Sequence, residues 1–186
     1  MKLVRKKKSN AYSISSIKSQ DLKPKTKKYL EIGLLQKLFR NVSKYIDERT
    51  EESIDQLKNY LMDHHPFFLK VHPLIIQCIL KLSNFYEVKK NTIIYKAGTY
   101  DRSFYIIICG RVKIMNNKPL NLKFFKVCKV GDIFGEEGIF EGKKTKRKES
   151  AVVAKDCLII EVKYDEYWRL KEEMQRFGYK EAILKM

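Results

Sequence analysis

The segment 130–151 gathers the residues of this sequence that could bind an anionic ligand. Gly135 would let the backbone approach a ligand closely, because glycine has no side chain. If Gly135–Ile139 begins a short helix, its unpaired N–H groups would form an anion site. The run 143–148 then adds five positive charges. That run could equally be a separate polyanion patch, a solvated surface or a mobile loop.

Patterns typical of catalysis or metal binding do not emerge. No two cysteines form a CxxC pair, and each lies in an apolar segment, which predicts buried, reduced thiols in a cytosolic-type compartment. The histidines show no metal-ligand spacing, and His64 and His65 are predicted to end a helix before Pro66. No nucleophile–base pair is recognisable. We therefore expect a protein that is not an enzyme, with no metal and no cofactor. The cysteines are Cys78, Cys109, Cys128 and Cys157.

The chain is strongly basic, with a net charge of +17 over 186 residues and a pI near 9.6. Ten basic residues and one acidic residue, Asp21, lie in 1–28, so this tail carries about half of the net charge. Its apolar residues show no period, which predicts disorder in the isolated chain. Such charge favours a diffuse attraction to polyanions such as nucleic acid, an anionic membrane face or an acidic protein. No apolar run is long enough for a membrane span.

Helices are predicted before and after a central β region. Apolar spacing and capping residues predict helices over 27–47, 51–63 and 73–83, with Thr50 as a cap and Pro73 in a first turn. Leu74 is expected to face inward in the third. A closing helix is predicted over 164–176, with an inner face of Tyr164, Tyr167, Trp168 and Leu170.

Short β-type runs separated by turn signals fill the middle of the chain and predict antiparallel strands. The fold class is therefore α+β and mainly β: an antiparallel β-roll or jelly-roll-like barrel flanked by N-terminal helices and a C-terminal helix. Gly98, Gly110 and Gly131 stand where turns with positive φ are expected. The predicted strands are 85–88, 92–96, 103–108, 111–115, 122–129, 151–154 and 157–163.

Two blocks of this region resemble the cyclic nucleotide-binding domain family. The first is TIIYKAGTYDRSFYIIICGRVKIM at 92–115, and the second is VGDIFGEEGIFEG at 130–142, which is similar to the family's phosphate-binding cassette. SAVVAKDC at 150–157 resembles the strand that follows. The resemblance implies a cyclic nucleotide-binding-like domain over 51–178, after a tail (1–28) and a helix (29–50), with a short extension at 179–186. The matching residues of the first block are Ile94, Tyr95, Gly98, Tyr105, Ile106, Gly110 and Val112.

The resemblance also implies roles for individual residues. Glu136 stands where the family binds the ribose 2′-hydroxyl, and Lys148 stands where it places an arginine on the phosphate. Arg147 could take that role through a one-residue shift. Glu149 replaces a small apolar residue and puts a carboxylate near the phosphate. The implied ligand site comprises Phe134, Gly135, Glu136, Glu137, Gly138, Arg147, Lys148, Glu149, Ser150 and Ala151.

Two functions follow from this resemblance. The first is a regulatory module that binds cAMP or cGMP and acts through a protein partner, such as one with an acidic surface. The alternative is a degenerate form of the same fold that serves as a structural or docking subunit through its basic tail. Specific nucleic-acid binding is not expected, because lysines act as point charges. The expected location is cytoplasmic, with mitochondrial or cytoskeletal and ciliary association left open.

Overall fold

The computed structural model describes residues 24–43, 48–100, 102–116, 124–137 and 145–176, with the side chains of 24–30 and 124–125 excepted. The chain divides into two compact units, Met1–Leu34 and Leu35–Met186, and the fold described here is that of the second. The predicted tail, 1–28, lies almost wholly outside the described residues, as does the extension 179–186. Among the described helices, none is long and apolar enough to cross a membrane.

Local sequence signals set the bounds of the helices. Helix α1 spans Pro24–Val42 and so ends earlier than the predicted segment. Helix α2 spans Glu51–His64, and the Thr50 hydroxyl accepts a hydrogen bond from the Ser53 N–H, as a cap should. His65 ends α2 before Pro66, as predicted. A short 3-10 helix, η4 (Phe68–Lys70), leads to α3 (Pro73–Leu82), which begins on its proline, and α5 spans Tyr164–Arg176.

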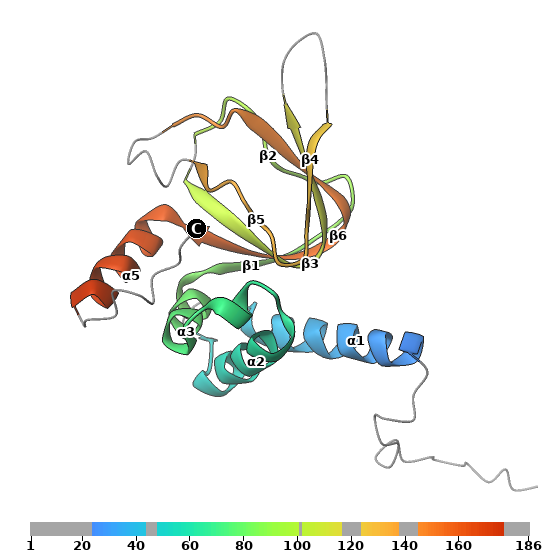
Figure 1. Ribbon diagram of the computed structural model, residues 1–186, viewed down its shortest axis with the longest axis vertical. Helices are drawn as coiled ribbons and strands as arrows, with labels where there is room; N and C mark the ends of the chain where they lie inside the picture. Colours follow the sequence, from blue (N-terminus) through green and yellow to red (C-terminus); the bar gives the residue numbers. More distant parts are fainter. Residues whose placement is uncertain (1–23, 44–47, 101, 117–123, 138–144, 177–186) are drawn as a thin grey trace, which may run out of the picture. The chain divides into compact units, whose positions relative to one another are not determined.

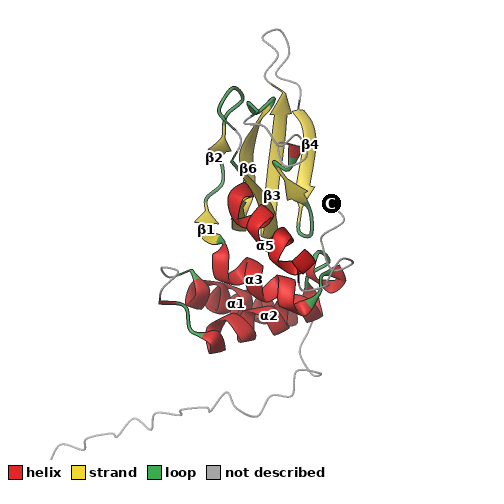
Figure 2. Ribbon diagram, turned by 90° about the vertical axis from the view of Figure 1, so that its left-hand side faces the viewer, coloured by secondary structure: helices red, strands yellow, loops and turns green. Residues whose placement is uncertain are grey.

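The strands form one six-stranded antiparallel sheet that curls into a roll (Figures 1 and 2). Its central path is β1-β6-β3-β4, while β2 pairs with β6 and β5 pairs with β3. The fold class is therefore the predicted α+β roll with flanking helices. The strands are β1 (Asn84–Val88), β2 (Ile93–Tyr95), β3 (Ser103–Asn116), β4 (Phe124–Lys129), β5 (Ile133–Phe134) and β6 (Glu149–Lys163).

The two long strands correct the predicted strand list. The runs 103–108 and 111–115 are one strand, β3, and the runs 151–154 and 157–163 are one strand, β6. Gly110 has φ +100° and marks a shift in the β3–β6 register, so it bends a continuous strand and does not end it. A Cβ there would lie 2.4 Å from the Asp156 carbonyl oxygen, which leaves room only for glycine.

Two apolar cores stabilise the second unit. One lies between the helices and the sheet, where α2, α3 and α5 pack on Phe104, Ile106 and Ile160. The other fills the inside of the roll around Ile107 and Val153. The buried His65 joins the two layers, because its Nε2 lies 2.9 Å from the Ile107 carbonyl oxygen.

Two side chains lie differently from the prediction. Trp168 is 37% exposed, and the Lys171 Nζ lies 4.5 Å from its ring centre, so the tryptophan does not pack α5 onto the roll. Tyr167 and Leu170 do that instead and are buried. Leu74 is exposed as well, because it lies in the first turn of α3, ahead of the buried Ile75 and Ile76.

Candidate functional site

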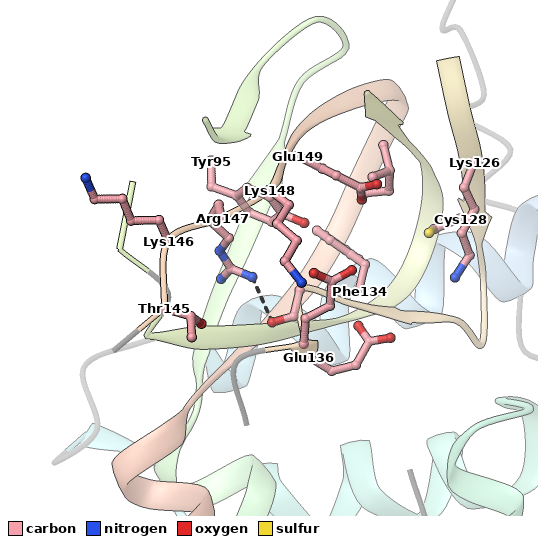
Figure 3. Close-up of a pocket in the computed structure, with 13 residues that line it drawn as sticks. Tyr95, Lys126, Cys128, Phe134, Glu136, Thr145, Lys146, Arg147, Lys148 and Glu149 are labelled. Atoms are coloured by element: carbon pink, nitrogen blue, oxygen red, sulfur yellow. Dashed lines mark hydrogen bonds between the residues drawn. The ribbon is translucent and has the colours of Figure 1, made fainter. Parts of the chain in front are cut away.

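A pocket lies beside the inner core of the roll (Figure 3). The segment 134–137 forms one side, and the residues that enter β6 form another. Strands β2, β3 and β4 supply the rest. The lining residues are Tyr95, Ile114, Lys126, Cys128, Phe134, Gly135, Glu136, Glu137, Thr145, Lys146, Arg147, Lys148 and Glu149.

Arg147 is the cation that the structure holds most firmly in this pocket. Only 8% of the residue is exposed, and its Nη1 donates a hydrogen bond to the Gly135 carbonyl oxygen at 2.7 Å (Figure 3). Its Nη2 donates to the Ser103 carbonyl oxygen. The guanidinium carbon also lies 4.0 Å from the ring centre of Tyr95, a favourable cation–π distance. These contacts fix the guanidinium against the segment that resembles a phosphate-binding cassette.

The backbone around Arg147 explains this placement. The Gly98 N–H donates to the Arg147 carbonyl oxygen at 2.8 Å, and the Arg147 N–H donates to the Thr99 carbonyl oxygen at 2.7 Å. Gly98 itself has φ +84°, which suits the turn that brings 98–99 beside Arg147. The predicted turn glycine therefore anchors the arginine backbone.

Aromatic rings form the wall beneath the guanidinium. Tyr105 and Phe134 stack with ring centres 5.1 Å apart, and Tyr95 stacks on both at 5.9 Å and 6.2 Å. Such stacked pairs contribute stability in addition to that from burying their apolar area. The Arg147 guanidinium therefore packs against a stacked set of aromatic rings.

Gly135 connects the pocket to helix α5. Its φ is +78°, and a Cβ would lie 2.5 Å from the Arg147 Nη1, so a side chain there would displace the arginine. The same Gly135 carbonyl oxygen accepts a second hydrogen bond, from the Tyr164 hydroxyl at 2.6 Å. Tyr164 is the first residue of α5. A change at this carbonyl would therefore reach the closing helix.

Three carboxylates stand among the cations of the pocket: Glu136, Glu137 and Glu149. Partial burial raises the pKa of Glu149, and the neighbouring charge of Glu137 raises it further. Burial also raises the pKa of the Cys128 thiol to about 11, so this cysteine stays protonated at neutral pH. The site is thus a mixture of opposite charges.

Comparison with known proteins identifies the domain. The sequence pattern of the family described as "Cyclic nucleotide-binding domain" matches residues 86–173. Residues 86–173 thus match the pattern of the cyclic nucleotide-binding domain family. The match contains both blocks on which the resemblance rested. No relative is detected among curated protein sequences.

Solved structures share the fold of this region. DNR, a transcriptional regulator of Pseudomonas aeruginosa, has a TM-score of 0.55 at 21% identity, over 63% of this chain and 52% of DNR. The catabolite activator protein of Thermus thermophilus has a TM-score of 0.53 at 18% identity, over 63% and 55%. A cAMP-bound structure of PfPKA-R has a TM-score of 0.50 at 22% identity, over 67% and 46%. The chain thus spans about half the length of each.

The structure brings most of the predicted site residues of this domain together. Arg147 is buried, whereas Lys148 is exposed. Ser150 and Ala151 do not line the pocket: the Ser150 Oγ accepts a hydrogen bond from the Ala97 N–H, and Ala151 is buried in the inner core. Gly138 lies outside the described residues, as does Ile139, the last residue of the predicted helix start. The predicted residues that line the pocket are Phe134, Gly135, Glu136, Glu137, Arg147, Lys148 and Glu149.

Several lining residues were not predicted from sequence. Lys126 and Cys128 are two apart on β4, so an alternation pattern would have placed them on one face, but only the register shows that this face is the pocket. Tyr95 was recognised as part of the first block and not as a site residue. Lys146 lines the pocket, yet its amine extends away from the other labelled side chains (Figure 3). Its Nζ lies 5.6 Å from the ring centre of Tyr100. Among the described residues, no cluster could hold a metal ion.

Proposed function

We propose that this pocket binds a cyclic nucleotide, cAMP or cGMP, and that the chain is a regulatory module acting through a protein partner. The observation that carries the proposal is the buried Arg147 guanidinium beside the glycine-containing cassette segment. In this proposal Arg147 binds the cyclic phosphate and Glu136 accepts the ribose 2′-hydroxyl. Lys148 is close enough in sequence to add a second, weaker cation.

A phosphate would compete with backbone carbonyls for Arg147. A phosphate carries a full negative charge and can accept two parallel hydrogen bonds from a guanidinium, whereas a carbonyl is neutral, so a phosphate favours exchange of the Gly135 contact. The Gly135 carbonyl would then keep only its bond from Tyr164. This rearrangement is a physical route from ligand to α5, through which a partner could sense the ligand.

The carboxylate of Glu149 opposes this binding. A charge near the phosphate weakens affinity, because like charges in a surface dielectric repel by a few kcal/mol at most. We therefore expect a dissociation constant of about 10 µM or weaker. The raised pKa of Glu149 indicates that its ionised form is already disfavoured here.

The same residues support a second candidate, a docking subunit that no longer binds nucleotide. Arg147 already donates to two backbone carbonyls and stacks on Tyr95, and three carboxylates line the pocket. In this second proposal, the roll is a scaffold and the basic tail makes the contact with an acidic partner. The four cysteines of the chain support a location in a reducing compartment such as the cytoplasm.

Calorimetric titration of the full chain with cAMP, cGMP and 5′-AMP tests the two candidates. We expect both cyclic nucleotides to bind more tightly than 5′-AMP and the Glu136→Gln variant to bind at least about tenfold more weakly. Arg147→Met should weaken the binding of the cyclic nucleotides. Its matched control, Lys148→Met, should weaken that binding less. Glu149→Gln should bind about threefold to tenfold more tightly. If the wild type and Glu149→Gln both fail to bind, while both are folded by circular dichroism, the docking subunit is the better conclusion.

A further inference from the structure

The outer face of the sheet carries a row of three cations beyond the helix-covered region. Arg111 on β3 lies directly opposite Lys129 on β4 and Lys155 on β6. Residues opposite each other in an antiparallel sheet share a face, and neighbouring strands lie about 4.8 Å apart. Lys113 follows two residues after Arg111 on the same face. All four side chains are exposed, and we call them the basic sheet face.

This arrangement is unfavourable in the isolated chain. Like charges directly opposite each other in a sheet are destabilising. Nearby carboxylates are engaged elsewhere: Asp132 accepts a hydrogen bond from the Lys129 backbone N–H, and Asp156 accepts from the Lys89 Nζ and the Lys90 N–H. Within the described part of the chain, no salt bridge includes a residue of the basic sheet face. An external anion would therefore remove a repulsion.

Exposed aliphatic side chains flank the cations. Lys113 lies opposite Val127 on β4 and Val152 on β6, and Val152 lies opposite Ile93 on β2. Val127 is 42% exposed and Ile93 is 48% exposed. The face therefore presents a cationic row beside a row with two exposed apolar side chains.

We propose that the basic sheet face docks on an anionic phospholipid surface. Mobile headgroups can place their phosphates and carboxylates wherever the cations stand, so three lysines and one arginine need no fixed partner geometry. Each lysine or arginine near such a surface contributes about 1 kcal/mol, and the exposed Val127 and Ile93 can contact the interfacial region.

Two other polyanions fit this face less well. Neither row carries an aromatic side chain on which an unpaired base could stack, which disfavours single-stranded nucleic acid. Ion pairs with an acidic protein would be exposed, and exposed pairs are commonly worth about 0.2–1 kcal/mol each. A lipid surface also supplies many anions at once.

Co-sedimentation of the full chain with vesicles tests this proposal. The vesicles contain phosphatidylcholine alone or with about 30% phosphatidylserine, and sedimentation is measured at two salt concentrations. The test variant is Arg111→Glu with Lys113→Glu. Its matched control, Lys70→Glu with Lys163→Glu, makes the same change of net charge at exposed positions off this face. Both variants keep the whole N-terminal tail, so the comparison isolates the face.

We expect binding only to the phosphatidylserine vesicles, weaker binding at higher salt, and at least about a tenfold loss of affinity in the test variant. The control variant should lose about threefold or less. Equal losses in the two variants would overturn the proposal, as would equal binding to both kinds of vesicle.

A test variant that loses binding to polyglutamate or to single-stranded RNA but keeps vesicle binding would assign the face to that polyanion. Thermal midpoints no lower than that of the wild type verify that both variants fold, and a milder pair, Arg111→Gln with Lys113→Gln, repeats the test without added acids.

Discussion

The two halves of strand β3 have opposite surroundings. From Ser103 to Ile108 every residue is buried, because the helices cover one face and the inner core of the roll covers the other. From Arg111 to Ile114 buried and exposed residues alternate. Strand β6 divides in the same way, with continuous burial at Cys157–Ile160 and alternation at its start. We call the two regions the covered half and the open half of the sheet.

The covered and open halves of β3 and β6 therefore have different roles. The covered half is a run of apolar residues on both faces, as in sheets covered on both sides. It supplies a rigid base. The open half must present polar groups, and it carries the pocket on its inner face and the basic sheet face on its outer face. Polar function is thus placed where burial no longer dictates apolar side chains.

The junction between the halves should be the position most sensitive to mutation. Gly110→Ala would put a Cβ 2.4 Å from the Asp156 carbonyl oxygen at a positive φ, so the two long strands would have to separate. We expect the free energy of unfolding to fall by about 3–5 kcal/mol, measured by urea denaturation.

Gly98→Ala is the matched control, because Gly98 also has a positive φ but no atom lies within 4 Å of its Cβ position. It should cost only the backbone strain, about 1 kcal/mol. Equal costs for the two variants would show that the close approach at Gly110 is not what joins the halves.

Side-chain truncation should separate the covered half from the open half. Ile106 is fully buried between the sheet and the helices, so Ile106→Ala should lower the free energy of unfolding by about 2–5 kcal/mol. Lys113→Ala, on the exposed outer face of the open half, should change it by less than about 0.5 kcal/mol. Similar losses would mean that the open half is as tightly packed as the covered half.

In the pocket, Arg147 and Lys148 should differ in their effect on stability. Arg147→Met removes two hydrogen bonds to carbonyls and the contact with Tyr95, which should cost about 2 kcal/mol in thermal or chemical unfolding. Lys148→Met removes an exposed amine and should cost less than about 0.5 kcal/mol. The reverse order would contradict the position of the guanidinium in the pocket.

His65, which contacts the covered half, and Glu149, in the open half, should respond to pH with opposite sign, and this is the smallest effect. Burial lowers the pKa of His65, so the unfolded chain binds a proton first as pH falls through about 6.5, and this residue's contribution to stability decreases. Burial raises the pKa of Glu149, so the folded chain binds a proton first as pH falls toward about 4.3, and its contribution increases.

Unfolding curves between about pH 7.5 and pH 4.5 measure both contributions. The acid loss should be smaller in His65→Gln than in the wild type, and the acid gain should be absent in Glu149→Gln. A His65→Gln curve parallel to that of the wild type would show that the histidine is not held neutral between helix and sheet.

Local sequence signals determined much of this fold. Thr50, Pro73 and the apolar spacing of 164–176 predicted three helices almost to the residue, because capping and amphipathic period act within a few turns of chain. The strand runs and their turn glycines predicted the roll, and the order of two motif blocks indicated the family. The pocket segment 134–137 also followed from the sequence, since the cassette motif is contiguous.

Only the tertiary structure decided which side chains face the pocket. A shift of one residue in a strand reverses every side chain, so sequence alignment alone could not decide between Arg147 and Lys148 as the buried cation. Lys126 and Cys128 joined the site through the register between β3 and β4, which no local signal specifies. The continuity of β3 through Gly110 and the exposure of Trp168 likewise depend on which distant segment lies opposite, because burial is set by neighbours remote in the chain.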